Sequence, residues 1–185
     1  RLDPSSALLG HRESVDFDFF SEKRYNASKI LDELKSMLLD DEAIEIKEQD
    51  ADTLIIFINS IKISFFFYNH KLLDSKIKLL DNIKLASVKD IFAMKLIAIS
   101  QRGTKKDFID MYFLLNNGFE MFDAVQVLNE KYEKVKFNKL HILKSFSYFD
   151  DADLDAEPKM LKKVSWQEVK NYIQNKAKSF LKELV

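Results

Sequence analysis

The spacing of apolar residues changes along this chain, and that change constrains the fold more than any other feature of the sequence. Before about residue 87, apolar and polar residues largely alternate, as in 14–20 and 61–68, which is the period of a β-strand. After residue 87, apolar residues recur every three or four positions, as in amphipathic helices. Strands followed by helices are typical of α+β proteins. We therefore expect an α+β fold with a sheet region over 1–86 and a helical region over 87–185 that completes the same compact unit.

The same periodicity places the individual elements. In the first half we expect a helix over 26–40, strands over 14–20 and 43–47, a hairpin with arms over 54–57 and 61–68, and an extended piece over 83–86. In the second half, Ser87 followed by Asp90 is a helix-start signature, and Gly103 is placed to end that helix. Further helices are expected over 104–115, 120–133, 138–146 and 166–184. The acidic run 150–155 is predicted to be a surface loop.

The composition excludes several kinds of site. The absence of cysteine excludes disulfides, thiolate zinc sites and cysteine nucleophiles. Three isolated glycines cannot form a glycine-rich phosphate loop, and three scattered histidines argue against a multi-histidine metal site. A net charge of -1 means that any nucleic-acid site must be a local patch. The sequence has no transmembrane run and no signal peptide, and we expect a cytoplasmic protein. Because the other kinds of site are excluded, any catalysis must rest on carboxylates and lysines.

Asp16 and Asp18 are the first candidate site. On a strand, residues i and i+2 project from one face roughly 7 Å apart. Such a pair can hold hard divalent cations, since Mg²⁺ is normally bound by one or two carboxylates and by substrate phosphates. The alternative is an acidic, solvated face of an edge strand. Flanking aromatic residues make that alternative less attractive.

Lys95 is the second candidate, because it is the only polar residue between Ile91 and Ile99. An ammonium group on an apolar stripe needs an anionic partner or an opening onto a cleft. The alternative is a lysine that extends from the edge of the stripe to solvent. Four further lysines either contact RNA or form a solvated helix face, and the second alternative is the simpler one: Lys131, Lys134, Lys136 and Lys139.

A basic cluster over 102–106 is the third candidate, because positive charge at a helix start is unfavourable unless an anion compensates it. Asp107 and Asp110 follow on one face of that helix. Asp107 could instead be the third-position acid of a cap that begins at Thr104, and Asp110 an ordinary first-turn acid. His11 and Arg12 either line a cleft beside the aspartate pair or are plain loop residues.

Together these residues resemble the AbiEii/AbiGii toxin family of nucleotidyltransferases, in the DNA polymerase beta-like superfamily. Residues 9–20, LGHRESVDFDFF, are similar to the family's Gly-His-Arg-x-Ser-x-Asp-x-Asp-Phe-Phe stretch. The similarity continues over 93–96, 102–103, 106–112, 148–152 and 165–166, so it covers nearly the whole chain. It implies a small mixed nucleotidyltransferase sheet flanked by helices.

The resemblance also implies a reaction: an acceptor hydroxyl attacks the α-phosphorus of a nucleoside triphosphate, and pyrophosphate leaves. It implies Mg²⁺ on Asp16 and Asp18, with Lys95 and Asp107 completing the catalytic set. The nucleotide-binding residues that it implies are Ser14, Arg12, Arg102 and Lys106. The implied partners are tRNA as the acceptor and a cognate antitoxin that restrains the toxin.

The chain departs from the superfamily pattern at two places. The expected Gly-Gly or Gly-Ser turn falls at Arg1-Leu2 and is absent, and because the chain begins with Arg we expect a truncated N-terminus. The position of a third carboxylate matches Ser64. These departures motivate a second hypothesis, a nucleotidyltransferase fold that binds a partner without catalysis. A third hypothesis is nucleotide transfer to a small molecule, as in antibiotic inactivation.

Overall fold

The computed structural model describes residues 9–14, 16–39, 43–74, 77–78, 84–133 and 135–183. Within it the chain forms two compact units. The first comprises residues 14–70, and we call it the sheet unit. The second, the helical unit, comprises the chain from residue 71 onward together with the segment that ends at Glu13. The α+β class predicted from the periodicity is confirmed.

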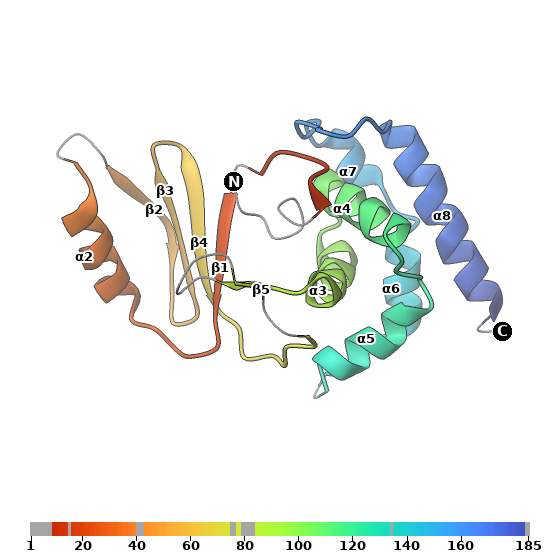
Figure 1. The fold of residues 1–185 in the computed structure, drawn as a ribbon, viewed down its shortest axis with the longest axis horizontal. Coiled ribbons are helices and arrows are strands. Elements are labelled where there is room, and N and C mark those ends of the chain that lie inside the picture. The colour runs from red at the N-terminus through yellow and green to blue at the C-terminus, as the bar shows by residue number, and fades with distance from the viewer. Residues whose placement is uncertain are drawn as a thin grey trace. The chain divides into compact units, whose positions relative to one another are not determined.

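The sheet unit contains one four-stranded mixed sheet. Its strands lie in the order β1 (Asp16–Ser21), β4 (Ile61–Phe67), β3 (Thr53–Ile58) and β2 (Ile44–Gln49) (Figure 1). β1 is parallel to β4, whereas the other neighbouring strands are antiparallel. Asn59 and Ser60 connect β3 to β4 with φ values of 50° and 64°, the left-handed backbone that a tight hairpin requires. The predicted small mixed sheet and its hairpin are therefore confirmed.

α2 (Ala27–Met37) packs on one face of this sheet. Its Leu31 is buried against Leu54 and Ile56 of β3, and Phe65 of β4 packs on the same cluster. Phe19 of β1 stacks on Phe65, with ring centroids 5.3 Å apart, so the odd-numbered residues of β1 face α2. Because side chains alternate along a strand, the even-numbered residues of β1 lie on the opposite face. We call that face the aspartate face, after Asp16 and Asp18.

The helical unit is organised around α3 (Val88–Gln101) and α4 (Lys105–Asn116). Ser87 Oγ accepts a hydrogen bond from the backbone N–H of Asp90 and donates one to its carboxylate, which confirms the predicted start of α3. Gly103 has φ 52° and stands between the two helices, as expected of a residue that ends α3. Fully buried apolar residues from both helices form the core: Phe92, Leu96, Phe108, Met111 and Leu114.

The remaining elements surround these two helices. α8 (Trp166–Glu183) packs on α4, and both α5 (Asp123–Lys131) and α6 (Lys139–Ser145) pack on α3 (Figure 1). A two-stranded pair, β5 (Ile77–Lys78) and β6 (Lys84–Leu85), completes the unit. Trp166 contacts the rings of Phe108 and Phe149 at the start of α8. No helix among the described residues is both long and apolar enough to cross a membrane.

Two expectations for this half of the chain are wrong. The acidic run predicted as a loop contains the short helix α7 (Asp150–Leu154), because acidic side chains suit the positive end of a helix and Ala152 is buried. Lys131 was expected to lie on a solvated helix face or to contact RNA, but its side chain is buried. Its fully buried ammonium group lies 2.6 Å from Asp90 Oδ1, and it donates to the carbonyl of Lys71. Lys134 lies outside the described residues.

Candidate functional site

Asp16 and Asp18 lie on the aspartate face of β1, and both side chains are half-buried. The parallel pairing with β4 places Lys62 beside Asp16 and Ser64 beside Asp18. Ser14, just before the strand, is buried, and its hydroxyl donates to the carbonyl of Asp16 at 3.2 Å. The structure therefore groups three of the predicted site residues, Ser14, Asp16 and Asp18, on one strand and its entry.

Ser64 occupies the position at which the superfamily pattern led us to expect a third carboxylate. Its side chain is fully buried, and its Oγ has no hydrogen-bond partner among the described residues. A buried hydroxyl without a partner is costly, so this atom suits a ligand or a metal-bound water molecule. The aspartate face thus presents two carboxylates and one hydroxyl.

This donor set fits a magnesium ion. Mg²⁺ is usually held by one or two carboxylates, with water and substrate phosphates as its other ligands. No group of three or more histidine, aspartate or glutamate residues within the described ranges is arranged to enclose a metal ion. The fit to Mg²⁺ therefore rests on the carboxylates of Asp16 and Asp18, with the Ser64 hydroxyl beside Asp18.

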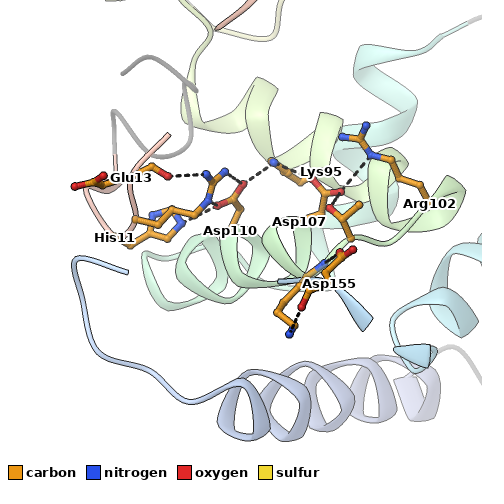
Figure 2. Close-up of polar contacts among 10 residues, drawn as sticks. His11, Glu13, Lys95, Arg102, Asp107, Asp110 and Asp155 are labelled. Atoms are coloured by element: carbon orange, nitrogen blue, oxygen red, sulfur yellow. Dashed lines mark hydrogen bonds and ion pairs between the residues drawn. The ribbon is translucent and has the colours of Figure 1, made fainter. Parts of the chain in front are cut away.

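A second polar cluster lies in the helical unit, between α3 and α4. Figure 2 shows a continuous chain of contacts that begins at His11, passes through Asp110 and Lys95, and reaches Asp107 and Arg102. Arg12 joins this chain through its hydrogen bond to Asp110. We call these six residues the ion-pair network. Both aspartates in it are fully buried, so their charges depend on the surrounding cations.

Lys95 is the centre of the network. It extends from α3, where Phe92 and Leu96 are fully buried, and its own side chain is only 14% exposed. Its Nζ lies 2.9 Å from Asp107 Oδ1 and 2.5 Å from Asp110 Oδ2. The anionic partner that the sequence analysis required is therefore present. Two carboxylates hold this ammonium group in position.

Asp107 connects Lys95 to the start of α4. It accepts hydrogen bonds from Thr104 Oγ1 at 2.6 Å and from Arg102 Nε at 3.3 Å. Burial alone would raise the pKa of Asp107, but the charges of Lys95 and Arg102 hold it below the usual value. The Arg102 side chain remains 63% exposed, so it can meet an incoming anion. Lys106, in the first turn of α4, is half-buried.

Asp110 is the member of the network that the sequence analysis assigned no chemical role. Arg12 donates to both of its oxygens, from Nε at 2.7 Å and from Nη2 at 2.8 Å, and His11 Nε2 contacts Oδ1 at 2.7 Å. Burial would raise the pKa of Asp110, yet Lys95, Arg12 and His11 hold it well below its usual range. The only sequence signal was its spacing of three residues from Asp107.

A carboxylate from elsewhere in the protein binds the amino end of α4. Asp155 Oδ2 accepts from the backbone N–H of Lys105 at 2.8 Å. The Lys105 ammonium group, itself buried, donates to the Asp155 carbonyl at 2.6 Å and to Glu157 at 3.3 Å. Asp155 therefore provides part of the negative charge that the basic cluster needs, which the sequence analysis did not foresee.

The structure divides the predicted site residues into two groups. Ser14, Asp16 and Asp18 belong to the sheet unit, and the others belong to the helical unit: Arg12, Lys95, Arg102, Lys106 and Asp107. Within each unit the residues lie close together in the way described above. The position of the expected glycine turn, Arg1-Leu2, lies outside the described residues.

Comparisons with known proteins show the family and the fold. Residues 6–180 match the family described as nucleotidyl transferase AbiEii toxin, type IV toxin–antitoxin system. The uncharacterized protein aq_aa25 of Aquifex aeolicus is 37% identical over 191 residues, covering 97% of this chain and 87% of that protein.

Two solved structures from Helicobacter pylori share the fold. JHP933 has a TM-score of 0.56 and 19% identity, covering 98% of this chain and 82% of its own. A candidate nucleotidyltransferase has a TM-score of 0.58 and 18% identity, with coverage of 98% and 85%.

Proposed function

This chain belongs to the AbiEii family of nucleotidyl transferase toxins of type IV toxin–antitoxin systems, and we propose that it transfers a nucleotide from a nucleoside triphosphate to tRNA. The family implies a nucleoside triphosphate as substrate and an antitoxin as partner. The observation that carries the proposal is the pair Asp16 and Asp18 on one face of β1, beside a Ser64 hydroxyl that has no hydrogen-bond partner in the part of the chain that the structure describes. We place the activity in the cytoplasm, which the cysteine-free composition suits.

In this proposal Asp16 and Asp18 hold Mg²⁺. When bound, the ion would neutralise charge on the triphosphate and on the leaving pyrophosphate. The two carboxylates would fix the position of the ion, because pairing with β4 holds β1 in a rigid sheet. The Ser64 hydroxyl, next to Asp18, has a donor to offer a phosphate oxygen or a metal-bound water.

We propose, from the resemblance to the family, that Lys95 and Arg102 bind the phosphates. Arg102 presents a largely exposed guanidinium group, which suits planar, bidentate phosphate binding. Asp107 holds both cations, and its lowered pKa makes it a positioning carboxylate rather than a strong base. Lys106 adds positive charge in the first turn of α4, and Ser14 supports β1 beside Asp16.

Arg12 differs from the other nucleotide-binding residues implied by the resemblance. Its guanidinium group is nearly fully buried and makes a bidentate contact with Asp110. We therefore propose that Arg12 positions Asp110, and through it Lys95, rather than contacting the nucleotide.

The direct test is transfer of label from α-labelled nucleoside triphosphates to total tRNA in the presence of Mg²⁺. We expect Asp16→Asn to lower the rate at least about 100-fold, because it removes a charge that the transition state requires. Asp32→Asn is a matched control on α2 and should keep the wild-type rate, since Asp32 is exposed. A folded wild-type protein that labels no tRNA, or an Asp16→Asn variant as active as wild type, would contradict the proposal.

Ser64 supports one further candidate function. A site with two carboxylates in place of three suits a protein that binds a nucleotide or a partner without catalysis. Mg²⁺-dependent turnover of a nucleoside triphosphate that depends on Asp16 would exclude this candidate.

A further inference from the structure

Four aromatic side chains continue the aspartate face beyond Asp18. Phe20 is two residues further along β1, and it pairs in register with Phe66 of β4. Their rings are stacked, with centroids 5.5 Å apart and an interplanar angle of 27°. Tyr68 packs edge-on against Phe20 at 5.2 Å, and His70 against Tyr68 at 4.8 Å. We call Phe20, Phe66 and Tyr68 the aromatic platform.

The platform is not part of the apolar core of the sheet unit. That core lies on the other face, between the sheet and α2. Phe20 is 41% exposed, and Phe66 and Tyr68 are half-buried. The backbone of Tyr68 donates to the carbonyl of Ser21 at 2.9 Å, so the pairing of the two chain segments continues past the strands and fixes this end of the platform.

The register of β1 and β4 therefore gives the aspartate face two adjacent levels. Asp18 and Ser64 form a polar level, and Phe20 and Phe66 form an aromatic level next to it. Two residues along a strand separate the levels by roughly 7 Å. The buried hydroxyl of Ser64, which has no hydrogen-bond partner among the described residues, suits a ligand at the polar level.

We propose that the aromatic platform binds the base of the nucleoside triphosphate whose phosphates would share a Mg²⁺ ion with the aspartate pair. A nucleotide joins a charged phosphate group to a flat aromatic base, and the metal-binding carboxylates and the aromatic rings lie next to one another in the same order. The inference rests on the proposed function. It extends that function by assigning the base a binding surface in the sheet unit.

The chemistry of the platform also predicts its selectivity. Stacking uses the face of a base, which all four bases share, whereas discrimination needs hydrogen bonds to base edges. Phe20 and Phe66 carry no hydrogen-bonding group in their side chains. The stacked pair of Phe20 and Phe66 should therefore strengthen the binding of purine and pyrimidine nucleotides alike.

The test is equilibrium binding in Mg²⁺ by calorimetry, using the α,β-methylene analogues of ATP and UTP and inorganic tripolyphosphate. We expect Phe20→Ala to weaken both analogues by about 5- to 150-fold, the range of one base–aromatic stack. Binding of tripolyphosphate should not change, because it has no base. Phe20→Tyr keeps an aromatic ring and should keep the wild-type affinities. Phe122→Ala removes another exposed phenylalanine, 65% accessible in the helical unit, and should change none of them.

Each other outcome overturns the inference in a recognisable way. If Phe20→Ala binds the analogues as well as wild type does, the platform does not hold the base. An equal loss of tripolyphosphate would show damage to the phosphate site instead. A variant altered only in its KM for tRNA would assign the platform to the acceptor. Wild-type protein that binds neither analogue nor tripolyphosphate would contradict the proposed function as well.

Discussion

The carboxylate of Asp110 illustrates how single residues determine this structure. It faces His11, Arg12 and Lys95, and its lowered pKa means that folding favours the charged form. A carboxylate of this kind stabilises the fold above its unfolded pKa of about 3.9. The contribution is lost as the pH falls through the lower pKa of the folded state.

Asp110→Asn should therefore lower the free energy of unfolding at pH 7 by about 3–5 kcal/mol, because it leaves buried cations without their partner. Urea unfolding across a pH series measures this difference. It should shrink as the pH falls below about 3.9, where the carboxylate of the unfolded chain takes up a proton, and vanish below the lower pKa of the folded state. Asp151→Asn, at an exposed position in α7, should cost less than about 1 kcal/mol. Equal losses in the two variants would refute the assignment of Asp110.

Residue-level prediction from the sequence succeeds where the partners are close in the chain. Asp16 and Asp18 are two residues apart on a strand, so their shared face follows from alternation alone. Lys95 was singled out because it is charged within an apolar stripe. Asp110 received no role because Arg12, its bidentate partner, lies 98 residues away in the sequence. Local spacing carries no information about such a contact.

At the scale of elements, the junction of α3 and α4 depends on Gly103. Its φ of 52° is unfavourable for residues with a Cβ atom, and a Cβ there would lie 3.3 Å from both the Ile99 carbonyl oxygen and the Phe108 ring. Gly103→Ala should lower the free energy of unfolding by more than the roughly 1–2 kcal/mol of the backbone penalty.

Gly10 provides the matched comparison for Gly103. It has a similar φ of 57°, but nothing lies within 4 Å of an added Cβ. Gly10→Ala should therefore show the backbone penalty alone in the same urea titration. If Gly103→Ala were no more destabilising than Gly10→Ala, close packing would not be the reason for a glycine between the helices.

Helices and strands were predictable where capping residues and the spacing of apolar residues agreed. They were less predictable where contacts between distant parts of the chain determine the local structure. Ser87 and Asp90 marked the start of α3 correctly, and Asn59-Ser60 marked the hairpin. The run 150–155 was assigned as a loop because its acidic side chains suggested solvent. In the structure Ala152 is buried and the first five residues of the run form α7. The Asp155 carboxylate, which follows α7, accepts a hydrogen bond from the first backbone N–H of α4.

At the scale of the whole molecule, the period of apolar residues predicts the α+β class but not which segments join which unit. The segment before β1 belongs to the helical unit, although it directly precedes a strand of the sheet unit. Arg12 and Met160 form an isolated antiparallel β-bridge, and the backbone N–H of Glu13 donates to the carbonyl of Lys159. These pairings connect distant parts of the chain, so no local pattern could reveal them. The boundary between the two units also divides the candidate site residues into two groups.

Nucleotidyl transfer by this protein depends, in our proposal, on the aspartate pair. The most direct measurement is pyrophosphate released per nucleotide added to tRNA, with wild-type protein and with Asp18→Asn, in Mg²⁺. We expect one pyrophosphate for each nucleotide added by the wild type, and neither product from Asp18→Asn or after chelation of the metal. Release of inorganic phosphate without nucleotide addition, or undiminished pyrophosphate release by Asp18→Asn, would contradict it.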